Sequence, residues 1–119
     1  MDKADLQKRL KTFALRCYKL TSSLPQNHGG KYFQNQLMRA SMSAYANYRA
    51  ACIGQSKATF IAKLSIAFEE ADECCIWLDM IVETEILPKD KVELLLKEAK
   101  ELASILAVAR KSAQHSIQN

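Results

Sequence analysis

A short turn between two long apolar stripes constrains this chain more than any other feature. Before the turn, apolar or small residues recur at alternating spacings of four and three: Phe33, Leu37, Ala40, Ala44, Asn47 and Ala51. After the turn, the same spacing covers three heptads: Phe60, Leu64, Ala67, Ala71, Cys74, Leu78 and Ile81. This spacing is typical of helices packed in a bundle. We expect Gly54 to end the first helix in the left-handed conformation and Ser56 to cap the second. Because the turn is so short, the two helices must be antiparallel neighbours.

Two further stripes complete the pattern. One predicts a helix over residues 5–20: Leu6, Leu10, Phe13, Cys17 and Leu20. The other predicts a helix from about residue 90 to about residue 113: Val92, Leu95, Leu96, Ala99, Leu102, Leu106 and Ala109. The central pair is predicted at 31–52 and 56–85. We expect His28 in a polar loop and residues 115–119 as a frayed tail. The chain is therefore predicted to be all-α, an antiparallel up-down-up-down four-helix bundle forming one domain over residues 1–119.

Composition supports this fold class and argues against others. Three Gly and two Pro are too few for an all-β fold rich in tight turns. No apolar run approaches the roughly 20 residues of a membrane span. The first residues lead into a polar amphipathic segment and do not resemble a signal peptide. We therefore expect a cytoplasmic protein with no membrane association.

Charge is distributed unevenly along the chain. No Asp or Glu lies between Leu6 and Phe68, whereas eleven acids and four lysines lie between Glu69 and Glu101. The basic residues of the 5–20 helix fall opposite its apolar stripe, so that helix should present a basic face without compensating acid. The candidate nucleic-acid contacts are the basic residues of this acid-free part, except Lys31. They are Lys8, Arg9, Lys11, Arg16, Lys19, Arg39, Arg49, Lys57 and Lys63.

The sequence offers little support for catalysis or for a metal site. The four cysteines have no C-x-x-C spacing, so reduced structural thiols are favoured over metal or redox use: Cys17, Cys52, Cys74 and Cys75. The acidic run at residues 69–73 invites a metal hypothesis, but di-iron bundles need Glu-x-x-His pairs on two helices. Neither His28 nor His115 has a Glu three residues earlier. We expect no cofactor, no metal and no catalytic residue, and hence not an enzyme.

Two features suggest assembly of several copies. Asn47 lies on an apolar stripe, and a buried, hydrogen-bonded Asn can fix the register of packed helices. The 56–85 helix carries more apolar residues than one stripe needs, Phe68 and Trp77 among them, so it either lies centrally or packs on another subunit. A basic early part and an acidic late part can also meet head to tail in a closed ring.

A block of residues in the two central helices carries a family resemblance. The block runs as follows: Arg39-Ala40, Ser43, 46–52 (ANYRAAC), 56–58 (SKA), 60–64 (FIAKL), 69–73 (EEADE) and Trp77-Leu78. It is similar to a bacterial four-helix-bundle family first noticed in intervening sequences of large-subunit ribosomal RNA genes. The chain departs from the family at residues 53–55, where basic residues are frequent, and at Thr59, where a capping glutamate is usual.

The resemblance implies an up-down-up-down bundle that assembles as a cyclic pentamer. A relative, the accessory variability protein of diversity-generating retroelements, binds a reverse transcriptase and nucleic acid through a basic surface. Our leading hypothesis is thus a non-enzymatic homo-oligomer that binds RNA or DNA, or a nucleic-acid enzyme such as a reverse transcriptase. The alternative hypothesis is a protein-binding scaffold with no nucleic-acid role.

Overall fold

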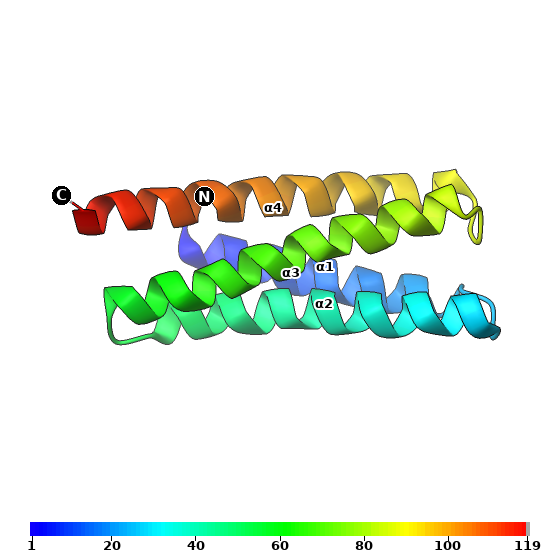
Figure 1. The fold of residues 1–119 in the computed structure, drawn as a ribbon, viewed down its shortest axis with the longest axis horizontal. Helices are drawn as coiled ribbons and strands as arrows, with labels where there is room; N and C mark the ends of the chain where they lie inside the picture. Colours follow the sequence, from blue (N-terminus) through cyan, green and yellow to red (C-terminus); the bar gives the residue numbers. More distant parts are fainter. Residues whose placement is uncertain (119) are drawn as a thin grey trace.

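Four antiparallel helices run up, down, up and down along one axis (Figure 1). The computed structural model describes residues 1–118, with side chains through residue 116. The helices are α1 (Lys3–Thr21), α2 (His28–Ile53), α3 (Lys57–Glu83) and α4 (Lys89–Gln118). Together they measure 50 × 21 × 19 Å. The predicted all-α four-helix bundle is confirmed.

Three helices begin with a side-chain cap. Asp2, Asn27 and Ser56 each accept a hydrogen bond from the backbone N–H three residues later, which satisfies one of the free donors of the first turn. The prediction for Ser56 is confirmed. The prediction for His28 is wrong: because Asn27 provides the cap, His28 is the first residue of α2 and not part of the loop.

The turn conformations differ from the prediction. Gly54 is extended, with φ −64° and ψ 143°, so it does not use the left-handed region. Within the described residues, the left-handed conformation occurs at a non-glycine position just after α3, where Glu85 has φ 57°. That position usually favours glycine, because a side chain there crowds the following carbonyl.

The C-terminal helix is longer than predicted. Residues 115–118, expected to fray, continue α4, while Asn119 lies outside the described residues. The reason is local: no Gly or Pro follows Pro88, so the chain contains no residue that would end the helix earlier.

The core is built from the predicted stripes. Its largest fully buried apolar side chains come from all four helices: Leu10, Phe13, Leu37, Leu64, Leu78, Ile81, Val92, Leu102 and Leu106. Alanines occupy much of the α2–α3 part of this core: Ala40, Ala44, Ala51, Ala67 and Ala71. Burial raises the pKa of the Cys17 thiol to about 12 and shifts that of Cys74 upward as well. Both cysteines therefore behave as small apolar core residues.

Asn47 does not join neighbouring helices. Its side chain is only partly buried, and its Nδ2 donates to the backbone oxygen (2.9 Å) and hydroxyl oxygen (3.0 Å) of Ser43, one turn earlier in α2. Asn47 is thus hydrogen-bonded as predicted, but it is only partly buried and both of these bonds lie within α2. The polar side chains that are fully buried are instead Thr21 and Ser41, whose hydroxyls donate to backbone carbonyls of their own helices.

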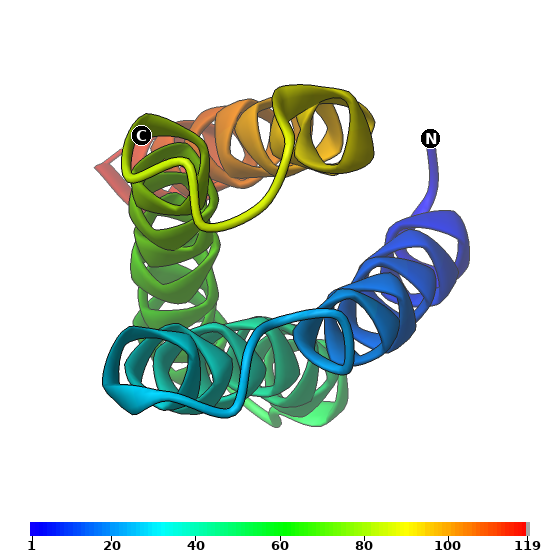
Figure 2. The same cartoon turned by 90° about the vertical axis from the view of Figure 1, so that its right-hand side faces the viewer.

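The four seams between adjacent helices are unequal. Contact is most extensive between α2 and α3 and least extensive between α1 and α4. In the end-on view, α1 and α4 are the neighbours whose ribbons are furthest apart (Figure 2). A surface hollow of about 410 Å³ lies on this seam, lined by residues that include Arg16, Leu20, Leu94 and Leu95.

Candidate nucleic-acid interface

Arg9 forms ion pairs with two carboxylates of α4 in the same chain. Its Nε and Nη2 donate to the two oxygens of Glu98, each at 2.8 Å, and Nη2 also lies 2.7 Å from Glu101 Oε1. The hydrogen bonds to Glu98 raise the pKa of Arg9, and the same pairing lowers the pKa of Glu98. The expectation that α1 lacks a compensating acid is wrong at this position, because α4 folds back alongside α1.

Arg39 is engaged in the same way on the other side of the bundle. Its Nη1 donates to Glu70 Oε2 at 2.8 Å and its Nη2 pairs with Glu73, both on α3. Trp77 Nε1 donates to the same Glu73 carboxylate at 3.1 Å. Acids that suggested a metal site thus join α2 to α3. Within the described part of the chain, no group of three His, Cys, Asp or Glu residues could hold a metal ion.

Six of the remaining seven predicted cations lie on two surfaces. The first is the outer face of α1, which carries Lys8, Lys11 and Lys19 together with the exposed apolar side chains of Leu15 and Tyr18. Arg16 lies to one side of this face, where it lines the hollow towards α4.

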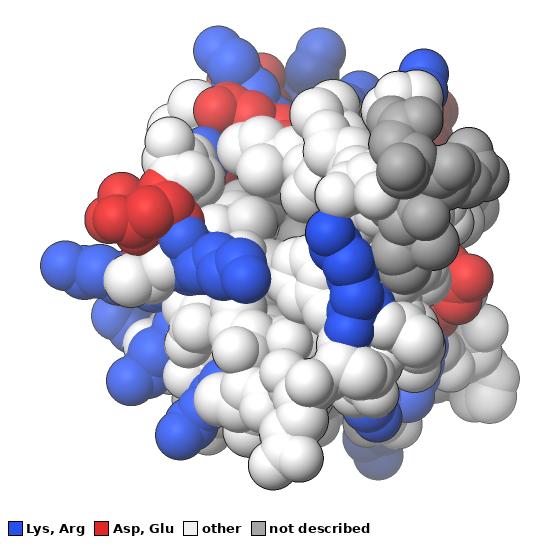
Figure 3. All heavy atoms as spheres, turned by 90° about the vertical axis from the view of Figure 1, so that its left-hand side faces the viewer, with Lys and Arg blue, Asp and Glu red and all other residues white. Residues whose placement is uncertain are grey.

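The second surface is one end of the bundle, which we call the basic end. It comprises the start of α1, the end of α2, the start of α3 and the end of α4: Lys3, Arg49, Lys57, Lys63, Arg110 and Lys111. Lysine and arginine side chains outnumber acidic ones over this end (Figure 3). In sequence, Asp2 and Asp5 are the acids nearest to it, because no Asp or Glu follows Glu101 or lies between Leu6 and Phe68.

Several of these cations are held in place by neighbouring helices. The Nζ of Lys3 lies 4.6 Å from the centre of the Phe60 ring, and the guanidinium of Arg110 lies 4.5 Å from that of Phe68. Lys57 Nζ donates to Ser116 Oγ at 2.7 Å. Contacts between α1, α3 and α4 therefore hold three of the six cations of the basic end, namely Lys3, Lys57 and Arg110.

Three residues of the basic end were absent from the predicted set, namely Lys3, Arg110 and Lys111. The signal that could have found them is the topology itself. In an up-down-up-down bundle, the end of the fourth helix lies beside the end of the second and the start of the third. Cations that are far apart in sequence therefore share one end.

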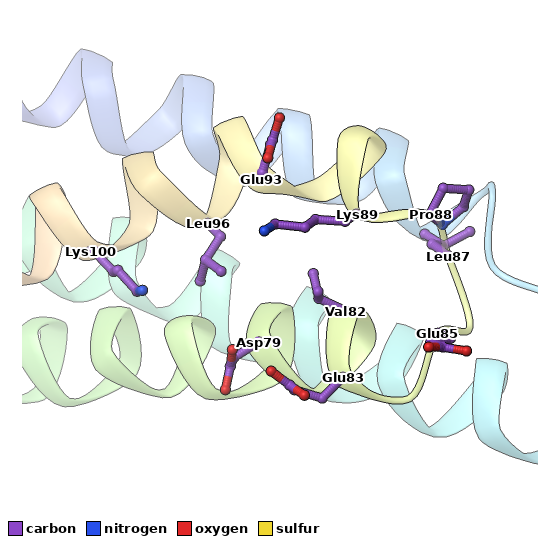
Figure 4. A pocket seen from close by; sticks show the side chains of 10 residues that line it. All are labelled: Asp79, Val82, Glu83, Glu85, Leu87, Pro88, Lys89, Glu93, Leu96 and Lys100. Atoms are coloured by element: carbon purple, nitrogen blue, oxygen red, sulfur yellow. The ribbon is translucent and has the colours of Figure 1, made fainter.

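A further hollow lies between α3 and α4 (Figure 4). It has a volume of about 770 Å³, and its charged lining residues include Asp79, Glu83, Lys89 and Lys100. Its lining includes no His, Cys, Ser or Thr that could act as a nucleophile beside a base. The two histidines begin α2 and end α4, at opposite ends of the bundle.

Together, the fold and its surfaces define a four-helix-bundle protein with a basic end and internally paired arginines. The family model described as 23S rRNA-intervening sequence protein matches residues 2–108, and the chain belongs to that family. It is similar to a crystal structure of a protein of unknown function from the S23 ribosomal protein family of Bacteroides thetaiotaomicron VPI-5482. The identity is 30%, the match covers 93% of this chain and 99% of that one, and the TM-score is 0.84. A search of curated proteins found no match.

Within residues 1–118, no helix combines the length and apolarity needed to cross a membrane.

Proposed function

We propose that this protein is a non-enzymatic homo-oligomer that binds nucleic acid through its basic end. The observation that supports this proposal is the convergence of six cations from all four helices, with Asp2 and Asp5 as the nearby acids. A concentrated array of Lys and Arg favours phosphate because binding releases the counterions condensed on the polyanion.

The basic end is a better candidate for phosphate than the outer face of α1. On α1, Leu15 and Tyr18 interrupt the lysines, and exposed apolar residues of this kind are more typical of protein contacts. Assembly would strengthen binding at the basic end, because a closed ring of copies repeats this surface around one face of the ring. Repetition raises avidity for a long polyanion beyond that of one copy. From the family resemblance we propose five copies in that ring.

The absence of an enzymatic role is supported by the same geometry. The core thiols of Cys17 and Cys74 have raised pKa values, so they are protonated and unreactive near neutral pH. The acids most suggestive of chemistry, Glu70 and Glu73, serve as partners of Arg39. A surface that binds phosphates through Lys and Arg side chains needs no catalytic group.

The test is fluorescence anisotropy with a labelled single-stranded RNA and a labelled DNA duplex, from low to physiological salt. Both probes should bind with little dependence on sequence, because phosphate contacts carry no sequence information. The slope of log affinity against log salt should be about −0.9 per phosphate engaged on the duplex and about −0.7 on the single strand. The charge reversals Lys57→Glu and Lys111→Glu together should weaken binding at least tenfold.

The matched control reverses two lysines at the opposite end, Lys89→Glu and Lys91→Glu, and should change affinity far less. Circular dichroism and light scattering would confirm that both variants keep the helical content and mass of the wild type. If the wild type binds neither probe at low salt, the nucleic-acid role is wrong and a protein-binding scaffold takes its place.

A further inference from the structure

The outer faces of α1 and α3 have matching patterns and opposite charge. On α1, the exposed residues Lys8, Lys11, Leu15 and Tyr18 follow one another at spacings of three, four and three. On α3, an exposed stripe has the same spacings and similar order: Glu69, Asp72, Ile76 and Asp79. In each stripe, two like charges precede an exposed apolar residue, and the sign is basic on α1 and acidic on α3.

The acids of the α3 stripe take part in none of the ion pairs formed by the described residues. Within residues 1–118, the ion pairs use Glu70, Glu73, Glu98 and Glu101, and none involves Glu69, Asp72 or Asp79. The four carboxylates of those pairs face neighbouring helices, whereas the carboxylates of the α3 stripe are exposed; Asp72 and Asp79 also border a hollow that Lys100 of α4 lines. The charge of the α3 stripe is therefore available to a partner outside the chain.

Exposed apolar side chains accompany the charges on both faces. Leu15 and Tyr18 on α1 are 50% and 54% exposed, and Ile76 and Met80 on α3 are 50% and 40% exposed. The aromatic residues expected at a subunit contact, Phe68 and Trp77, instead pack largely within the chain. An interface through α3 would accordingly use Ile76 and Met80. Burying such side chains contributes more to association than exposed ion pairs, which add only about 0–1 kcal/mol each.

The arrangement of the bundle allows both faces to be used at once. Helices α1 and α3 occupy diagonal positions, so their outer faces point to different sides of the molecule (Figure 2). They also run in the same direction (Figure 1). A rotation about an axis along the bundle keeps that direction, so α1 of one copy would lie parallel to α3 of the next, as the matching order of the stripes requires.

We propose that the outer face of α1 in one copy binds the outer face of α3 in the next. Lys8 lies against Glu69, Lys11 against Asp72, and Leu15 against Ile76, with Lys19 close to Asp79. The contact is heterologous, and rotation closes it into a ring. This inference rests on the homo-oligomer of the proposed function and names the surfaces that would form it.

The test uses charge reversal with rescue. One variant carries Lys8→Glu and Lys11→Glu, and the other carries Glu69→Lys and Asp72→Lys. In each, the α1 and α3 faces acquire the same sign, so at micromolar concentration the mass by light scattering should fall towards the 13.4 kDa of one chain. A chain with all four substitutions has opposite signs again and should regain the wild-type mass.

Matched controls and separate readouts make the outcomes distinct. The variant Lys89→Glu with Lys91→Glu, at the start of α4, should keep the wild-type mass, and circular dichroism should show native helicity throughout. A wild type of monomer mass would overturn both the homo-oligomer and this contact. A wild-type oligomer that withstands both reversals, or four substitutions that fail to restore assembly, would overturn the contact alone. RNA binding is then measured only on variants of wild-type mass, so its loss reports on the basic end.

Discussion

The α2–α3 seam and the α1–α4 seam are closed by different means. Between α2 and α3, alanines buried on both helices allow extensive contact, and Arg39 pairs with two carboxylates at the surface. Between α1 and α4, contact is sparse, a hollow of about 410 Å³ remains, and Leu94 is 70% exposed. Arg9 with Glu98 and Glu101 is the ion-pair cluster that joins these two helices.

The difference shows that similar ion pairs can have unequal weight in one bundle. Where packing already fixes the helices, an arginine at the surface adds little, because exposed pairs contribute about 0–1 kcal/mol. Where packing is sparse and the pair is partly shielded, the bidentate geometry of Arg9 on Glu98 should matter more. We therefore expect α2 and α3 to depend on the shape of the core and α1 to depend on charge.

The largest effect should come from enlarging a small core residue on α2. Ala40 is fully buried, and Ala40→Leu inserts extra carbons where there is no space, which should lower the free energy of unfolding by about 2–3 kcal/mol. Denaturant unfolding followed by circular dichroism measures this loss. The exposed Ala46 on the same helix is the control, and Ala46→Leu should change stability by less than about 0.5 kcal/mol. Equal effects at both positions would contradict the close packing described for α2.

A loss of stability of intermediate size should distinguish the two arginine clusters when each arginine is replaced. Arg9→Met removes a cation that is 24% exposed and leaves Glu98 without its partner, at an expected cost of about 1–2 kcal/mol. Arg39→Met removes a cation that is 51% exposed, at an expected cost of about 0.5 kcal/mol. Paired denaturation curves give both numbers. If Arg39→Met proved the more damaging substitution, the proposed dependence of α1 on charge would be wrong.

The same cluster predicts a pH dependence. Pairing with Arg9 lowers the pKa of Glu98 below its ordinary value of 4.5, so the stabilisation is present above that value. It is lost as the pH falls through the lower pKa of the folded state, where the carboxylate takes up a proton. Thermal unfolding from pH 6 down to pH 3 should show a shallower decline in Glu98→Gln than in the wild type. Identical slopes would mean that the pair contributes nothing.

The smallest effect is expected at the open part of the α1–α4 seam. Leu94→Ser should change the free energy of unfolding by less than about 0.5 kcal/mol, because the side chain remains largely in water. Its neighbour Leu95 is only 5% exposed, and Leu95→Ala should cost at least about 2 kcal/mol. The contrast between adjacent residues, measured by chemical denaturation, locates the edge of the core on α4.

The stripes of apolar residues were sufficient to predict four helices and their antiparallel order. They could not supply the partners of Arg9 and Arg39, because a stripe gives the inward face of each helix but not the hand of the bundle or the register between helices, which decide which carboxylates lie opposite. The predicted conformations of the turns were wrong, because the residue types at these positions did not indicate the conformations they adopt. Gly54 is free to be left-handed but is held extended, and Glu85 adopts φ 57° although its residue type gives no such signal. The basic end was half predicted, since Arg49, Lys57 and Lys63 were identified, while Arg110 and Lys111 belong to it through the topology.

Because Cys17 is buried, its alkylation can report how often α1 separates from the rest of the bundle. A thiol that is shielded from solvent and protonated at neutral pH reacts with an alkylating reagent only when the structure around it opens. With Cys52, Cys74 and Cys75 replaced by alanine, alkylation of Cys17 becomes a clock for the opening of α1. Because the α1–α4 seam is the least packed of the four, α1 should open more often than the whole chain unfolds. The bundle would then behave as a stable three-helix body with a fourth helix that leaves and returns.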